Sequence, residues 1–388
     1  MRILLPKIKT KKADRLIEQI GLKYFLRLSN KLKSQKSIKL TNISSDKILQ
    51  TVSHNISIYT VIISFLVGAL TTIPAVLFEL SFKNSYSLVE YYILLSLVTL
   101  VFLIIEVVTL YWLGMRTVYT ISSLTGYEDS QEKKLPLEYS VKNMMVRSAL
   151  ELEDPAVEYL GIDPQKYVSQ KWLVVRALLY KAKIVLTSIT MRFILRKIAM
   201  RYGLRVGFAW IAVPVTAVWD AVVMHRTIKD AKLRLFGYHL SQFISEEIIT
   251  DTLLQTYSPS VKEGCIRAIS SIMVLSKNYH PNSIILLIRL NQNLAITDAK
   301  EYDNLDDFLE YLRLATPKEQ HLLRTLAGIS AIFDAKLNRD EKMALKRIFA
   351  EKNEQYINFC IELKELLVSG QIHQASSLCE ETIIRDIY

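Results

Sequence analysis

Two long apolar runs near the start of the chain constrain its fold more than any other feature. Residues 57–80 read SIYTVIISFLVGALTTIPAVLFEL, and residues 88–114 read LVEYYILLSLVTLVFLIIEVVTLYWLG. A helix of about 20 apolar residues crosses the hydrocarbon layer of a bilayer, and such a helix tolerates a proline like Pro74. A short polar segment, SFKNSYS, joins the two runs. The sequence therefore predicts a two-helix transmembrane hairpin over residues 57–114.

The distribution of basic residues predicts how this hairpin is oriented. Residues 1–56 hold 13 Lys and Arg against 3 Asp and Glu, and the loop between the two runs holds only Lys83. Arg116, Lys133 and Lys134 follow the second run. Because basic flanks stay on the inner side, we expect both termini to be cytoplasmic and the protein to lie in the inner (cytoplasmic) membrane. Residues 1–56 then form a basic cytoplasmic segment.

Glu106 interrupts the second apolar run. An ionisable group inside a membrane span is costly and is by default a functional hypothesis, here a proton relay or an ion ligand. The alternative is structural: Glu106 is protonated or bonds a hydroxyl of the facing helix, such as that of Thr71 or Thr72.

A basic, apolar segment follows in residues 137–236, which we predict to be a membrane-proximal helical domain. Its sequence favours amphipathic helices lying on anionic lipid head groups, and the alternative is a helix pair whose charged faces are solvated. No motif supports a nucleic-acid partner. The predicted membrane-surface residues are nine cations without an intervening acid: Lys171, Arg176, Lys181, Lys183, Arg192, Arg196, Lys197, Arg201 and Arg205.

The stretch GFAWIAVPVTAVWDAVV, residues 207–223, is nearly long enough to span a membrane. Pro214 and Asp220 interrupt it, and a single span here would carry the C-terminal region across the bilayer. We expect either a buried helix of the cytoplasmic domain or a hairpin with part of residues 172–195 that enters the membrane and returns to the same side. If the stretch does span, Asp220 joins Glu106 as an intramembrane carboxylate.

The small and apolar residues around Gly207 and Pro214, followed by Asp220, Ala231 and Phe236, resemble the C-terminal part of EcsC-like proteins. The resemblance covers residues 200–236. It implies a helical, membrane-associated bacterial protein.

Residues 237–388 are predicted to form a mildly acidic C-terminal helical domain. Helical patterns recur at 241–255, 261–277, 282–294 and 305–314. Thr316, Pro317 and Glu319 match a capping box with proline at the first helical position, and a further helix is expected near Asn338. The three cysteines, Cys265, Cys360 and Cys379, have no metal-site spacing and are expected to be reduced core residues.

Asp334, Leu337 and Glu341 resemble the turn of tellurite-resistance TerB-like helical domains. The resemblance covers residues 260–375. It implies a binding role in membrane-associated stress-response assemblies and, by analogy, metal binding through Asp334 and Glu341. The same residues fit a helix N-cap and a first-turn acid, which is the interpretation we favour, so no metal site is predicted.

The chain shows no phosphate-binding glycine loop, GxSxG, HExxH or Rossmann fingerprint. We therefore predict neither an enzyme nor a cofactor. The predicted class is an all-α protein with a two-helix transmembrane hairpin and cytoplasmic helical domains. Two functions remain open. One is a scaffold or adaptor that recruits a protein partner, in an envelope or stress response. The other is a transporter or channel accessory subunit that uses Glu106.

Overall fold

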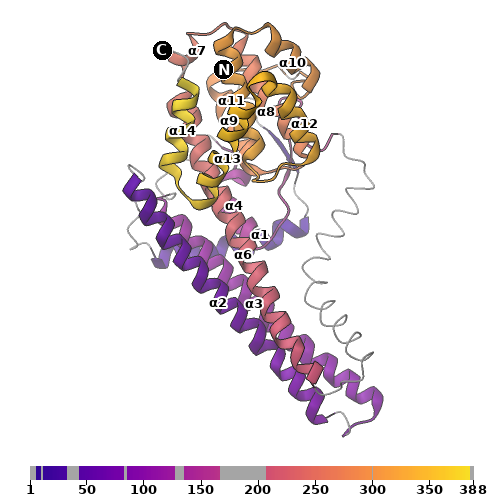
Figure 1. Cartoon of the computed structure of the whole chain (residues 1–388). Helices are drawn as coiled ribbons and strands as arrows, with labels where there is room; N and C mark the ends of the chain where they lie inside the picture. Colours follow the sequence, from indigo (N-terminus) through magenta and orange to yellow (C-terminus); the bar gives the residue numbers. More distant parts are fainter. Residues whose placement is uncertain are drawn as a thin grey trace. The chain divides into compact units, whose positions relative to one another are not determined.

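The computed structural model describes residues 6–9, 12–32, 43–82, 85–126, 135–166, 207–298 and 300–384. Figure 1 shows that this part of the chain is almost entirely helical, which confirms the predicted all-α class. The chain forms two compact units. We call Ser53–Val118 with Ser169–Ile228 the apolar unit, and Met1–Val52, Tyr119–Val168 and Lys229–Tyr388 the helical domain.

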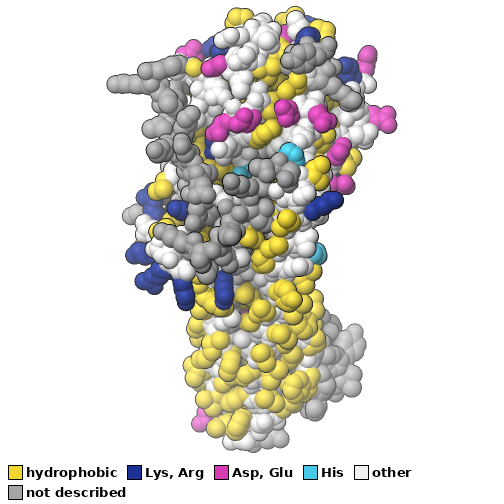
Figure 2. Space-filling view, turned by 90° about the vertical axis from the view of Figure 1, so that its left-hand side faces the viewer, with side chains coloured by type: hydrophobic (Ala, Val, Ile, Leu, Met, Phe, Trp, Pro, Cys, Tyr) yellow, Lys and Arg dark blue, Asp and Glu magenta, His cyan; other side chains and the backbone are white. Residues whose placement is uncertain are grey.

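Two long helices, α2 (Ile43–Phe82) and α3 (Leu88–Leu124), dominate the apolar unit. They form an adjacent pair, and both are long and apolar enough to cross a membrane. Only 28% and 11% of their most apolar stretches are buried, whereas the core helix of a soluble protein is mostly buried. Hydrophobic side chains cover the outer surface of this pair (Figure 2).

Helix α6 (Gly207–Phe243) contains the third apolar stretch and runs through Pro214 without a break. Its residues up to Ile228 belong to the apolar unit, and those from Lys229 belong to the helical domain. The stretch 207–223 therefore groups with α2 and α3 rather than with the core of the helical domain. The domain boundary expected after residue 236 falls inside this helix.

A buried ion pair joins two helices of the helical domain. Both α1 (Lys12–Leu32) and α4 (Val141–Ala149) belong to this domain and pack against each other. The guanidinium of Arg147 binds both carboxylate oxygens of Glu18, with an Nε–Oε1 distance of 2.9 Å. Both side chains are almost fully buried. Because removing one partner of a buried pair strands the other charge, this contact fixes which face of α1 turns inward.

A small antiparallel sheet joins β1 (Lys7–Lys9) to β2 (Ala156–Glu158), and it was not expected from the sequence. Each strand has only three residues, too few to show an alternating pattern. The sequence LEYSVKNMMVRSALELED, residues 137–154, predicts a helix that ends before Pro155, but the 3₁₀ turn η3 (Leu137–Tyr139) comes first and α4 ends at Ala149. Asp163 followed by Pro164 predicts the next helix start. Asp163 accepts a hydrogen bond from the Gln165 N–H (2.9 Å), and the helix predicted after it lies outside the described residues.

Three helices form the core of the helical domain: α8 (Val261–Ser276), α11 (Pro317–Ile332) and α13 (Asn353–Ser369). Helix α11 packs against both α8 and α13. The helix expected over 241–255 is divided into the end of α6, a π-helical segment η4 (Ile244–Ile248) and a short α7 (Asp251–Leu254). The remaining elements are α9 (Pro281–Leu294), α10 (Leu305–Leu314), α12 (Arg339–Phe349), η5 (Ala350–Lys352) and α14 (Ile372–Ile384).

The three cysteines are buried in this core as free thiols. Burial raises the pKa of Cys265 and of Cys360 to about 12, and it raises the pKa of Cys379 further. A thiol in such surroundings is a small apolar core residue.

Two capping boxes begin α11 and α12. The first, between Thr316 and Glu319, was predicted and is confirmed. The second is formed by Asn338 and Glu341, with Asn338 donating its backbone N–H to Glu341 (2.8 Å). Glu341 therefore serves as a helix-start residue, and Asp334 accepts hydrogen bonds from the Lys336 N–H and the Asn278 amide.

The two capping glutamates differ in the direction of their pKa shifts. Burial raises the pKa of Glu341 to about 8, and repulsion from Asp334 and Asp340 adds to this, outweighing the hydrogen bond from Asn338. Burial also opposes ionisation of Glu319, but hydrogen bonds from Ser258 and Thr316 outweigh it and lower its pKa.

We predict opposite pH effects when each glutamate is replaced by glutamine. Between about pH 4.3, the pKa of an unfolded glutamate, and about pH 8, folded Glu341 holds a proton that the unfolded chain has released. The free energy of unfolding therefore falls as pH rises through this window, and Glu341→Gln should remove that fall. The parent chain should lose stability when acid protonates Glu319, and Glu319→Gln should remove that loss. Thermal unfolding midpoints across this window test the Glu341 prediction, and midpoints below about pH 4.3 test the Glu319 prediction. Parallel curves for Glu341→Gln and the parent chain would contradict the first.

Candidate functional site

Glu106 of α3 is held by a hydroxyl of the facing helix. It is only 1% exposed, and Thr71 Oγ1 of α2 lies 2.8 Å from its Oε2. The same hydroxyl lies 2.9 Å from the backbone oxygen of Val67. The Thr71 hydroxyl donates to Glu106, and the backbone oxygen of Val67 is a second acceptor within reach of the same hydroxyl. Of the alternatives that the sequence left open for Glu106, the bond to a threonine hydroxyl of the facing helix is present.

Asp220 of α6 lies against the same turn of α2. It is 4% exposed. A Cβ added to Gly68 would collide with Asp220 Oδ2 and would lie 3.0 Å from the Cα of Ala217. Only glycine at position 68 lets α6 approach this closely. The backbone oxygen of Gly68 is also 2.8 Å from Thr72 Oγ1 and 3.3 Å from Thr71 Oγ1. The carboxylates of Glu106 and Asp220 therefore flank one turn of α2, residues 68–72.

A second hydroxyl contact joins α2 to α3. Thr60 and Thr117 are 2.8 Å apart at their hydroxyl oxygens, and both are buried. Ser64, also buried, donates to the backbone oxygen of Thr60 (2.9 Å). In apolar surroundings such interhelical bonds contribute about 0.6–2 kcal/mol each. The facing sides of α2 and α3 thus carry two polar contacts, Thr60 with Thr117 and Thr71 with Glu106, while their outer sides are apolar.

The buried polar groups between these helices, Glu106, Asp220 and the hydroxyls described above, can take part in few kinds of chemistry. Two carboxylic groups and hydroxyls can take up, hold and pass protons. In the described part of the chain, no group of three or more His, Cys, Asp or Glu side chains is placed to hold a metal ion.

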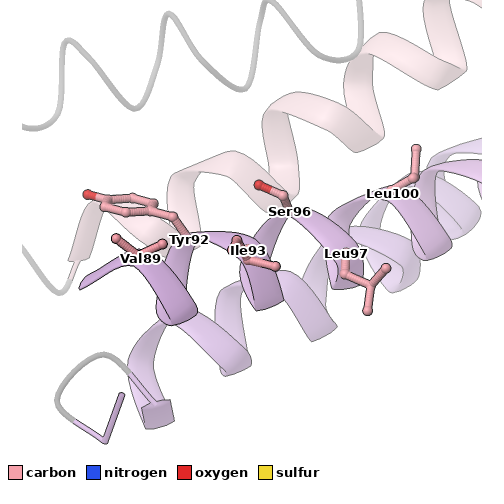
Figure 3. Close-up of a pocket in the computed structure, with 6 residues that line it drawn as sticks. All are labelled: Val89, Tyr92, Ile93, Ser96, Leu97 and Leu100. Atoms are coloured by element: carbon pink, nitrogen blue, oxygen red, sulfur yellow. The ribbon is translucent and has the colours of Figure 1, made fainter. Parts of the chain in front are cut away.

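The other predicted site residues are placed differently. The nine cations from Lys171 to Arg205 lie outside the described residues. On α3, six described residues line a shallow pocket, and Tyr92 carries the titratable side chain among them (Figure 3). They are Val89, Tyr92, Ile93, Ser96, Leu97 and Leu100.

A second cluster of buried charges lies in the helical domain. Arg234 of α6 donates to Asp230 (Nε–Oδ2 2.7 Å) and to both oxygens of Asp154. Ser148 donates to Asp230 (2.8 Å). Burial opposes the charge of Arg234, but the two carboxylates outweigh it and raise its pKa. Because Arg234 bonds both carboxylates, this cluster holds α6 to the loop after α4.

Sequence reasoning found Glu106, Asp220 and Thr71 but not Gly68. No local pattern marks Gly68, because its role depends on Ala217 and Asp220, which are far along the chain. Comparison with family models, curated proteins and solved structures finds no match to this chain. The resemblances to EcsC-like and TerB-like proteins therefore stay predictions.

We predict that Gly68→Ala destabilises the apolar unit. The new methyl group meets backbone at Ala217, which cannot rotate away, so overpacking should cost about 1–3 kcal/mol. Asp220→Ala in the same chain should recover only part of this, since it removes one of the two clashes. Leu70→Ile, at a position that is 65% exposed, is the matched control. Thermal unfolding in detergent measures all three; a Gly68→Ala chain as stable as the control would contradict the close contact.

Proposed function

We propose that this protein is an integral membrane scaffold or adaptor. The observation that carries the proposal is the outward-facing apolar surface of α2 and α3. An apolar surface of this length is unsuited to water and suited to lipid. The apolar unit is then the anchor, in the inner membrane, with both termini cytoplasmic as the basic flanks indicate.

The helical domain supplies the binding surface in this proposal. On α13, Ile357 and Ile361 are 40% and 52% exposed and stand one helical turn apart. Exposed Glu354, Glu362 and Glu365 surround them on the same helix. An apolar pair with an acidic rim suits a protein partner that has a basic, amphipathic segment. The TerB-like resemblance supports a partner that belongs to an envelope or stress-response assembly.

Recruitment of the partner to membranes tests the adaptor proposal. A photoreactive residue at position 361 should crosslink one partner in cells, and that partner should sediment with the membrane. Ile357→Asp with Ile361→Asp should leave it in the soluble fraction, because charge is brought into the apolar contact. Leu314→Asp changes another exposed apolar residue, on α10, and should have no effect. Equal membrane recovery of the partner with the double variant and with Leu314→Asp would count against the proposal.

A transporter or channel accessory subunit is the second candidate. It is favoured by one observation: Glu106 and Asp220 flank the same turn of α2 in the apolar unit. Two proton-binding groups at this position suit a proton relay through the bilayer.

We predict, for this second function, that Glu106→Gln abolishes proton flux in proteoliposomes. Glutamine can still accept the Thr71 hydrogen bond but cannot release a proton. Glu90→Gln is the control, because Glu90 is exposed and bonds Ser87 at the start of α3. A proton flux that is unchanged in Glu106→Gln, measured with a pH-sensitive dye, removes this candidate.

A further inference from the structure

The outward face of α1 combines apolar and cationic side chains. Leu16 and Ile20 are 63% and 70% exposed, and Ile17 and Leu26 are also exposed. Exposed apolar residues scattered singly need no explanation, but these four share one helix of 21 residues. Arg15, Lys23, Arg27 and Lys31 are exposed on the same helix.

The spacing places these residues in one stripe. Leu16, Ile20, Lys23 and Arg27 follow the pattern i, i+4, i+7 and i+11, which is one face of an α-helix. The opposite face is fixed inward by packing. There the Phe25 ring lies edge-on against Tyr119 of α3, with centroids 5.1 Å apart.

The acids of α1 leave this face uniformly basic. Glu18 is buried and bonded to Arg147, and Asp14 is half-buried. Among the α1 side chains that the structure describes, the exposed charged ones are therefore all cationic. A basic helix face with long apolar side chains between the cations is typical of helices that lie in the plane of an anionic membrane surface.

We propose that the outward face of α1 binds anionic lipid at the membrane surface. Leu16, Ile17 and Ile20 enter the head-group layer, while Lys23 and Arg27 pair with lipid phosphates. The lysine and arginine stems also suit this depth, because they can extend their charged ends toward the phosphates. This inference rests on the proposed membrane anchor, because α1 precedes the apolar part of α2 in the chain. A protein with an acidic surface is the competing occupant.

A fluorophore on α1 tests the proposal in the full chain reconstituted into vesicles. Ile20→Cys can be labelled selectively, because the native cysteines are all buried. We expect a lipid-borne head-group quencher to act more strongly in vesicles of phosphatidylcholine with phosphatidylglycerol than in phosphatidylcholine alone. Added salt should weaken the quenching. Lys23→Glu with Arg27→Glu should reduce it several-fold in the anionic vesicles. The matched control is Lys342→Glu with Lys346→Glu, two exposed cations on α12, which should leave it unchanged.

A second label separates this inference from the membrane anchor itself. Ile104, on the outer face of α3, is 55% exposed, and Ile104→Cys should be quenched by acyl-chain quenchers in both kinds of vesicle. Absence of quenching at position 104 would overturn the anchor. Quenching at position 104 with none at position 20, or with no dependence on lipid charge there, overturns the α1 proposal. Shielding of position 20 from both lipid and aqueous iodide overturns it in favour of a protein occupant.

Discussion

The contact between α2 and α6 at Gly68 is the constraint on which the apolar unit depends. Helices with apolar outer surfaces gain little from hydrophobic association in lipid, so close packing and hydrogen bonds hold them together. Here one turn of α2 provides both: a bare glycine that admits Ala217 and Asp220, and Thr71, which holds Glu106. This turn of α2 supplies the space that the Asp220 carboxylate occupies and the hydroxyl that bonds Glu106.

The features predictable from the sequence were the local ones. The apolar runs of α2 and α3 are continuous in sequence, and the capping box of Thr316 and Glu319 spans a few residues, so each was visible directly. The Thr71–Glu106 bond could be predicted because a short loop makes its two helices neighbours. Tertiary contacts between distant segments could not: Glu18 with Arg147, and β1 with β2, join residues more than a hundred positions apart.

The placement of α6 shows how a local rule can mislead. In the sequence, Pro214 and Asp220 interrupt the apolar stretch 207–223, which favours a buried helix or a re-entrant hairpin over a membrane span. In the structure the helix passes through Pro214, and Asp220 is buried beside Gly68. Composition alone does not show whether a polar residue in an apolar helix can be buried, because burial depends on the space that a neighbouring helix offers. The break after Phe243 could not be predicted, because no proline or glycine marks the π-helical segment Ile244–Ile248 in the sequence.

The three buried thiols have a consequence for how the helical domain responds to its surroundings. Because burial keeps them protonated and away from solvent, oxidants and alkylating reagents reach them only when the core opens. The rate at which the thiols are modified therefore measures how often the structure opens locally around α8, α13 and α14. In the folded domain the three thiols do not react with thiol reagents, and their modification therefore reports unfolding of the domain.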